Sequence, residues 1–293
     1  MTGTVRDRVF GGRLMQGLFH LRYELLDAIH YRKRSPDQAS TVAALRVLDR
    51  PLVAFTIAFN VPEAVALLSD TMACFAPDVP LVVCDNSTDA AACARLRAFC
   101  AEAGRLYCQV PRAPLVKFQS SRSHATALNW VLRNLIVPSG IRRFATLDHD
   151  LVLLGPDDLA GRLDRQPCYG YVRRQDRSRA WYLWPGFSLF DLDHIAPSVI
   201  NFGTDRMLGL DTGGRMWNTV YRHMDSDAFV PAVVREGQVP EADPNRLHQV
   251  FDAWFHVGQV SYRNGNLDVI AALRRRFERD PASLATITHV LSL

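Results

Sequence analysis

The chain has 293 residues, of which 48% are hydrophobic and 22% are charged, as in ordinary soluble globular proteins and unlike disordered, collagen-like or coiled-coil chains. No apolar run approaches the roughly 20 residues of a membrane-spanning helix, and the N-terminal residues show no secretion signal. Six cysteines occur without a metal-binding spacing, which favours free thiols in a reducing cytoplasm.

The net charge of +4 is concentrated at the N-terminus. Residues 1–34 hold seven basic and three acidic side chains, and the rest of the chain holds 27 of each kind. This balance gives no support for nucleic-acid binding by the main part of the chain. Arginine outnumbers lysine 32 to 2, a hint of a GC-rich bacterial genome, where a role in surface polysaccharide or glycolipid synthesis is plausible.

Residues 1–50 are predicted to form a helical extension. Between residues 9 and 31, apolar side chains recur at intervals of three and four and form one helical stripe, consisting of Leu14, Leu18, Leu21, Leu25 and Ile29. A basic cluster and Ser35-Pro36 end this helix. Two interpretations stay open: the helix packs on the main domain, or residues 1–34 form a basic amphipathic segment that contacts the inner face of an anionic membrane.

From residue 51 onward, strands and helices alternate. Short apolar runs predict strands at residues 51–60, 80–89, 105–110 and 141–154, and the segments between them predict helices at residues 63–75, 89–103 and 123–136. This alternation predicts βαβ units and therefore an α/β fold, with a mostly parallel sheet flanked by helices. We expect this domain to span residues 51–270, followed by a helical tail at residues 271–293.

Polar residues end the predicted strands, where open α/β sheets bind their ligands. They include Asn60, Asp85 and the triplet Asp148-His149-Asp150. Two carboxylates two residues apart suit a divalent cation that also bridges phosphate oxygens. The D-x-D pattern recurs at 191/193 and 225/227, so position decides: the end of a parallel strand favours a metal site at the triplet, with capping or another structural use as the alternative.

The order AFTIAFN, VVCDNSTD, SRSHATALNW, RFATLDHDLVLL resembles the nucleotide-sugar-binding half of GT-A-fold glycosyltransferases, close to family 2. The resemblance covers residues 52–155 well and 180–265 loosely. It implies a GT-A-like, Rossmann-like domain with a nucleotide-sugar-binding half at residues 51–155 and an acceptor half at residues 156–270. The implied activity is metal-dependent transfer of one sugar from a nucleoside diphosphate sugar, with UDP or GDP favoured, to a carbohydrate or lipid-linked acceptor.

The resemblance also assigns residues to roles. Those implied to bind the nucleotide sugar are Phe59, Asn60, Asp85, Asn129, Asp148 and Arg263. Asp150 and Asp148, with His256 as a third ligand, would hold Mn²⁺ or Mg²⁺. Asp211 stands beside Gly213-Gly214 and is a candidate general base toward the acceptor hydroxyl, although it also suits a structural turn.

Three features depart from the family pattern: a lone Asp85 after the second strand, no Glu-Asp pair near the acceptor, and no Q-x-x-R-W motif of processive synthases. We therefore expect single-sugar transfer. Two alternatives stay open. LDHDLV also resembles the start of haloacid-dehalogenase-like phosphotransferases, with Asp148 as nucleophile and Asp150 as acid/base. A non-catalytic GT-A-like domain would instead bind a sugar polymer or a partner enzyme.

Overall fold

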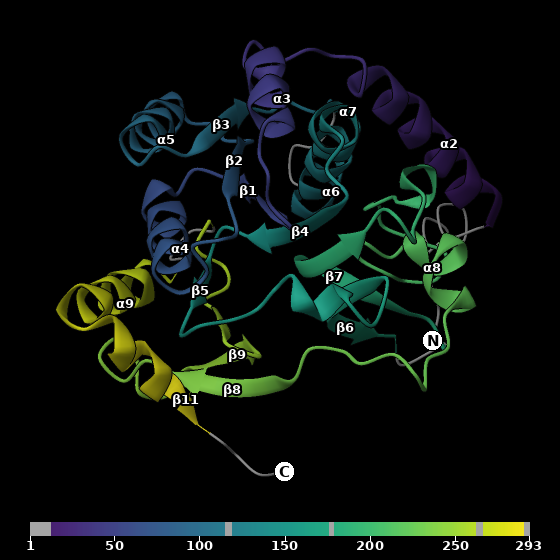
Figure 1. Cartoon of the computed structure of the whole chain (residues 1–293). Helices are drawn as coiled ribbons and strands as arrows, with labels where there is room; N and C mark the ends of the chain where they lie inside the picture. Colours follow the sequence, from purple (N-terminus) through teal and green to yellow (C-terminus); the bar gives the residue numbers. More distant parts are fainter. Residues whose placement is uncertain (1–12, 115–118, 176–178, 262–265, 290–293) are drawn as a thin grey trace, which may run out of the picture.

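The structure, a computed structural model, describes residues 13–114, 119–175, 179–261 and 266–289 (Figure 1). Its central sheet has the order β3-β2-β1-β4-β7-β6. The strands are β1 (Val53–Ala58), β2 (Leu81–Asp85), β3 (Leu106–Gln109), β4 (Arg143–Asp148), β6 (Cys168–Arg174) and β7 (Trp181–Asp191). Strands β3, β2, β1 and β4 are parallel, whereas β7 and β6 pair antiparallel. The predicted α/β fold with a mostly parallel sheet is confirmed.

Helices cover both faces of this sheet (Figure 1). The helices α3 (Gln38–Arg46) and α6 (Ser120–Val131) share one apolar core with Val53 and Phe55 of β1. The helices α4 (Pro62–Phe75) and α5 (Ala90–Glu102) share the other core with Ala54 and Ala58. Because alternate residues of a strand point to opposite faces, a strand buried on both sides needs a continuous apolar run. This explains the sequence of β1.

The helix predicted at residues 123–136 is longer than its sequence pattern indicated. It begins as α6 at Ser120, widens into a π-helical turn at Leu132–Ile136 and ends in α7 (Val137–Ser139). Gly140 follows with a φ of 81°, a conformation in which a residue with a side chain is strained and which commonly ends helices.

A second, smaller sheet has the order β11-β8-β9-β10-β5. Its strands are β5 (Leu151–Leu153), β8 (Val234–Gln238), β9 (Leu247–Phe251), β10 (Trp254–His256) and β11 (Thr288–His289). The predicted strand at residues 141–154 is therefore divided between two sheets, and the acidic triplet lies where the chain passes from one to the other. The helix α9 (Leu267–Arg279) packs on this sheet and on α4, and it begins before the expected boundary at residue 271.

The N-terminal helix α2 (Arg13–His30) lies against α6. The Asp27 carboxylate pairs with Arg122 of α6 at 2.6 Å, and the Arg122 guanidinium lies 4.4 Å from the ring centre of Tyr23. His30 is fully buried. The helix therefore packs on the main domain, but through polar and aromatic side chains. The predicted apolar stripe is not the packed face, since Leu21, Leu25 and Ile29 are exposed.

Candidate active site

A cavity of about 780 Å³ opens at the carboxyl ends of the parallel strands. Its walls come from the ends of β1 and β2, the start of α6, the Asp148–Asp150 triplet and β7, together with Asp211-Thr212 and parts of residues 256–261. Strand register explains this convergence, because Ile57 of β1 lies beside Asp148 and Ala58 lies beside Asp85. The volume is in the range of sites that hold small-molecule ligands.

The structure brings together Asp148, Asp150 and His256, which the sequence predicted as metal ligands. Strand β5 starts directly after Asp150 and pairs with β10, so that Leu151 lies beside His256. The backbone N–H of Val257 also donates to the Asp150 carbonyl at 3.1 Å. One side-chain ligand atom from each of the three residues lies within 4.8 Å of the others. Two ligand atoms on opposite sides of one divalent ion lie about 4.4 Å apart when each is bound at about 2.2 Å. Small movements of these side chains would therefore bring all three atoms within reach of one ion.

The surroundings of these carboxylates fit a cation. Oδ1 of Asp150 is buried without a hydrogen-bond partner among the described residues and lies 3.6 Å from Nε2 of His256. Burial and the charge of Asp148 raise the pKa of Asp150. Burial also acts to raise the pKa of Asp148, but the imidazoles of His149, His124 and His256 outweigh it and lower that pKa. An orphaned carboxylate oxygen beside a second carboxylate and an imidazole is a suitable donor set for Mn²⁺ or Mg²⁺.

His149, between the two aspartates, belongs to the same wall although the sequence assigned it no role. Its Nδ1 lies 3.5 Å from Asp148, and its Nε2 lies 3.0 Å from the hydroxyl of Ser261. That hydroxyl donates to the Phe59 carbonyl at 3.1 Å. Phe59 itself lines the cavity. The histidine thus joins the triplet to the end of β1 and to residues after β10.

Asp211 also lines the cavity, on a segment that is held in place rather than flexible. The Thr212 hydroxyl donates to the Ser121 carbonyl at 3.2 Å, and the Gly213 N–H donates to the Phe202 carbonyl at 2.7 Å. Gly213 has a φ of 92°, and a Cβ there would lie 2.7 Å from the Leu183 carbonyl oxygen. Only glycine allows this close approach. The Asp211 carboxylate is about half exposed and lies 3.9 Å from Arg173.

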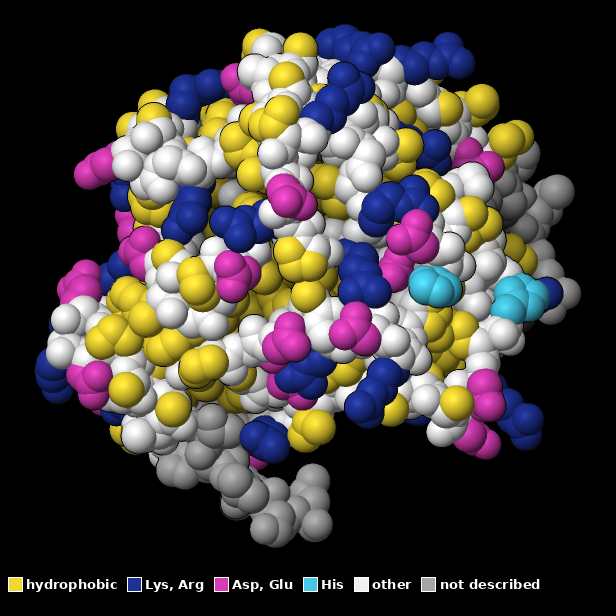
Figure 2. All heavy atoms as spheres, viewed as in Figure 1, with side chains coloured by type: hydrophobic (Ala, Val, Ile, Leu, Met, Phe, Trp, Pro, Cys, Tyr) yellow, Lys and Arg dark blue, Asp and Glu magenta, His cyan; other side chains and the backbone are white. Residues whose placement is uncertain are grey.

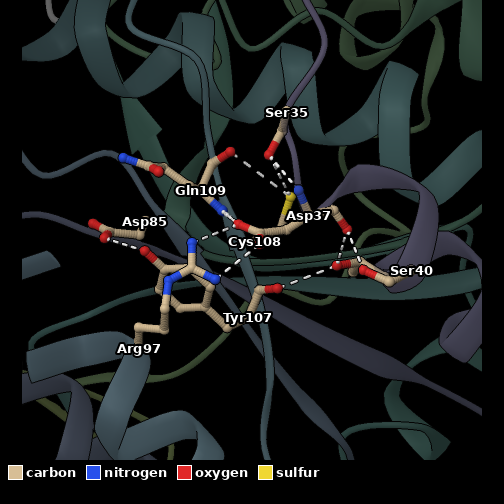
Figure 3. A network of polar contacts seen from close by, with 9 residues as sticks. Ser35, Asp37, Ser40, Asp85, Arg97, Tyr107, Cys108 and Gln109 are labelled. Atoms are coloured by element: carbon tan, nitrogen blue, oxygen red, sulfur yellow. Dashed lines mark hydrogen bonds and ion pairs between the residues drawn. The ribbon is translucent and has the colours of Figure 1, made fainter. Parts of the chain in front are cut away.

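Asp85 is buried and does not line the cavity. One carboxylate oxygen accepts from the Tyr107 hydroxyl at 2.7 Å (Figure 3), and the other accepts from the Ser87 N–H at 2.8 Å. The Arg97 guanidinium stacks 4.4 Å from the Tyr107 ring centre and pairs with Asp37. In this structure Asp85 therefore fixes the end of β2, and its neighbour Asn86 reaches the cavity wall.

Two further residues that the resemblance assigned to the nucleotide make hydrogen bonds to loops in this structure. Asn60, with a φ of 58°, accepts from the N–H groups of Thr88 and Asp89. The Asn129 amide accepts from the Phe202 N–H at 2.9 Å and donates to Asn201 at 3.0 Å. Neither side chain is part of the cavity wall. Arg263 lies outside the described residues.

The competing D-x-D pair at Asp191 and Asp193 lies at the far end of β7 and has a structural explanation. Asp191 is buried, pairs with Arg143 at 2.9 Å and accepts from the Asp193 N–H at 2.9 Å. Asp193 pairs with Arg142. Both carboxylates are therefore occupied by arginines or backbone, which leaves the Asp148–Asp150 pair as the better metal site.

The start of α6 and one tryptophan contribute wall residues to which the sequence assigned no role. The side chains of Ser120, Ser121, Ser123 and His124 line the cavity. Trp184 of β7 lines it too, with its ring centre 4.7 Å from that of His256. The serine run was a usable signal, because it lies at a helix start. Trp181, in contrast, packs in the core against Tyr221.

No protein-family model matches the chain, and no curated protein matches it. Among solved structures, the chain is similar to the mannosyltransferase PcManGT from Pyrobaculum calidifontis, in complex with GDP-Man and Mn²⁺. The two are 15% identical, with a TM-score of 0.35, over 60% of this chain and 54% of that enzyme. The chain thus matches about half the length of the mannosyltransferase, and a likeness at this level assigns no site residue.

Proposed function

We propose that the protein is a metal-dependent glycosyltransferase that moves a single sugar from a nucleoside diphosphate sugar, with UDP or GDP as the nucleotide, to an acceptor hydroxyl. The observation that carries this proposal is the convergence of Asp148, Asp150 and His256 on the wall of a cavity at the carboxyl ends of parallel strands. Such an edge is where open α/β sheets bind nucleotides.

The acidic cluster has the role of holding the donor diphosphate indirectly. Asp148, Asp150 and His256 would bind Mn²⁺ or Mg²⁺, which neutralises negative charge on the leaving diphosphate when bound. Two carboxylates alone would repel a diphosphate. A cation held by the three side chains would supply the positive charge that offsets this repulsion.

The remaining wall residues offer groups that suit different parts of a nucleotide sugar. Phe59 offers an aromatic ring to a nucleoside base, and Asn86 offers amide groups to the base or ribose. The start of α6 presents hydroxyls and backbone N–H groups, which favour an anionic ligand. Trp184, beside His256, offers an aromatic surface to a sugar ring.

Asp211 is the candidate base of the reaction. It reaches the cavity from the segment anchored by Thr212 and Gly213, and its carboxylate is half exposed. In an inverting reaction, it would accept the proton of the attacking acceptor hydroxyl. In that reaction the hydroxyl oxygen bonds to the anomeric carbon as the bond to the diphosphate breaks.

A thermal-shift matrix tests the proposal. The protein is melted with UDP-, GDP- and CMP-linked ligands, each with and without Mn²⁺. Ligand present at a hundred times its Kd stabilises the fold by about 2.7 kcal/mol, or roughly 5 °C in a protein of this size. A shift in melting temperature that needs both nucleotide and metal supports a metal-dependent donor site and identifies the nucleobase of the donor. A shift with phosphate alone favours the phosphotransferase, and no shift with any nucleotide favours a non-catalytic domain.

A further inference from the structure

The helix α2 has two faces of different character. Its inner face carries Asp27 and His30, which pack on the main domain. Its outer face carries Leu21, Leu25 and Ile29, whose side chains are 54%, 60% and 61% exposed. Intervals of four residues place these three on one side of the helix, one turn apart. Large apolar side chains in such a row, left in water, mark a surface that another apolar phase covers.

The outer face is held in this orientation by contacts of the inner face. Arg122, which is buried, pairs with Asp27 and stacks on Tyr23. The C-terminal end of the helix is fixed as well, because Nε1 of Trp130 donates to the Lys33 carbonyl at 3.0 Å. The polar inner contacts thus prevent the apolar row from turning inward.

Exposed basic side chains flank the apolar row. They are Arg22, Arg32, Lys33 and Arg34. None of the four has an ion-pair partner among the residues that the structure describes, and Lys33 donates only to the Arg112 carbonyl. The two acidic residues of α2 form ion pairs with the main domain, Glu24 with Arg215 and Asp27 with Arg122. Figure 2 shows Lys and Arg side chains gathered over the connection between α2 and α3, beside apolar side chains over α2.

We propose that the outer face of α2 is a membrane-contact surface that binds anionic bilayers. A row of leucine and isoleucine edged by arginine and lysine is complementary to such a bilayer, whose acyl region is apolar and whose surface is negative. The helix lies in the interface and does not cross it. In agreement, no helix in the described part of the chain is long and apolar enough to span a membrane.

The position of α2 places the bilayer near the candidate active site. Gln119 lines the cavity, and its amide donates to the Tyr23 hydroxyl at 3.5 Å on the inner face of α2. The outer face lies one helix diameter away, about 10–12 Å. A lipid-linked acceptor held by that bilayer would therefore lie near the cavity; that consequence rests on the proposed function, whereas membrane binding itself requires no nucleotide.

Vesicle co-sedimentation of the full chain, without nucleotide or metal, tests the surface. The vesicles are phosphatidylcholine alone or phosphatidylcholine with phosphatidylglycerol. We expect binding to the anionic vesicles only, reduced by added salt. The variant Leu21→Ser/Leu25→Ser/Ile29→Ser should bind at least about tenfold more weakly. Replacing Arg22, Arg32 and Arg34 by Gln should weaken binding about fivefold per charge, the equivalent of about 1 kcal/mol each.

The matched control is Val230→Ser/Val233→Ser. These valines are also exposed, at 64% and 52%, and they directly precede β8 rather than belonging to α2. The control should bind vesicles like the unchanged protein, and all variants should melt at similar temperatures because the replaced side chains are exposed.

Three results would overturn the proposal. One is failure of the unchanged protein to bind anionic vesicles, and another is equal binding by the Leu21/Leu25/Ile29 variant. The third is a dimer in sedimentation equilibrium without vesicles that this variant abolishes, because it would assign the face to a second copy of the chain. None of these results bears on nucleotide binding, which the thermal-shift matrix measures separately.

Discussion

Oδ1 of Asp150 lies 3.6 Å from Nε2 of His256, although the two residues come from segments far apart in the sequence. The pairing of β5 with β10 produces this contact, since it places Leu151 beside His256. Because the Asp150 oxygen is buried and otherwise unpartnered among the described residues, a cation is the simplest group to complete its surroundings.

Replacing Asp150 by Ala should abolish the part of nucleotide binding that depends on Mn²⁺. The fold should persist, because removing a buried carboxylate with a raised pKa also removes its repulsion with Asp148. Thermal melts with and without nucleotide and Mn²⁺ measure both effects, and the stabilisation of about 2.7 kcal/mol at saturating ligand should be lost. Asp150→Asn, which preserves the shape of the side chain, should behave alike.

The control for this variant is Asp227→Ala, in the exposed D-x-D pair at 225/227. It should keep the full metal-dependent shift. If Asp150→Ala retained that shift while Asp227→Ala did too, the metal site would have to lie outside the triplet.

The Asp191→Ala variant tests whether the D-x-D pair at 191/193 has a structural role and no role in ligand binding. Asp191 is almost fully buried and pairs with Arg143, so its loss should cost roughly 3 kcal/mol of unfolding free energy. Nucleotide- and metal-dependent stabilisation should be unchanged, because the residue lies at the opposite end of β7 from the cavity. Urea unfolding measures the first effect, and the ligand-induced shift in melting temperature measures the second. Loss of the ligand effect in a folded variant would restore Asp191 as a ligand candidate.

Replacing Asp211 by Asn should lower the turnover number without weakening the binding of the donor. A general base contributes about 10²–10⁴-fold to a rate, and the amide keeps the shape of the carboxylate while losing its basicity. Transfer assays should therefore show a fall in kcat of that size at an unchanged KM for the donor. The exposed Asp225→Asn is the matched control and should remain active. Retained turnover in Asp211→Asn would leave this residue with only its structural role in the turn.

Much of the fold was predictable because local and global preferences agree. The β1 sequence is almost entirely apolar, as a strand between two helical layers must be, and α5 begins where the helix at residues 89–103 was predicted, with Asp89 as its cap. The division of residues 141–154 between two sheets was not predictable. The apolar runs on either side of the triplet look alike, and only pairing with the distant β10 takes β5 out of the first sheet.

The position of Asp148 and Asp150 on the cavity wall was predictable, because there an acidic residue type coincides with the end of a strand. Asp85 has the same pattern, but its carboxylate is taken by Tyr107, which only the pairing of β2 with β3 brings near. His149 and Trp184 reach the cavity because of the orientation of their side chains. A sequence pattern does not show which way a side chain points in a turn such as that of His149, between β4 and β5. Nor does it show this for Trp184, on a strand that is buried on both faces.

The buried His30 predicts a pH dependence of stability that is independent of the active site. Burial, with the nearby charges of Lys33 and Arg122, lowers the pKa of His30 to about 4 from an ordinary value of 6.5. Neither ring nitrogen has a hydrogen-bond partner among the described residues. Between these two pH values the unfolded chain binds a proton that the folded chain does not. Stability should therefore fall as the pH drops below about 6.5, by at most about 1.4 kcal/mol per pH unit, until about pH 4.

Urea unfolding at about pH 7.5 and about pH 5 measures this loss. Carboxylates also titrate toward the lower pH, so the informative quantity is the difference between the protein and its His30→Leu variant. The leucine fills the buried site without a titrating group, and this variant should lose less stability between the two pH values than the unchanged protein. Replacing the exposed His223 by Gln should change the unfolding free energy at neither pH. An equal pH dependence in the protein and in His30→Leu would mean that His30 takes up its proton without leaving the packed face of α2.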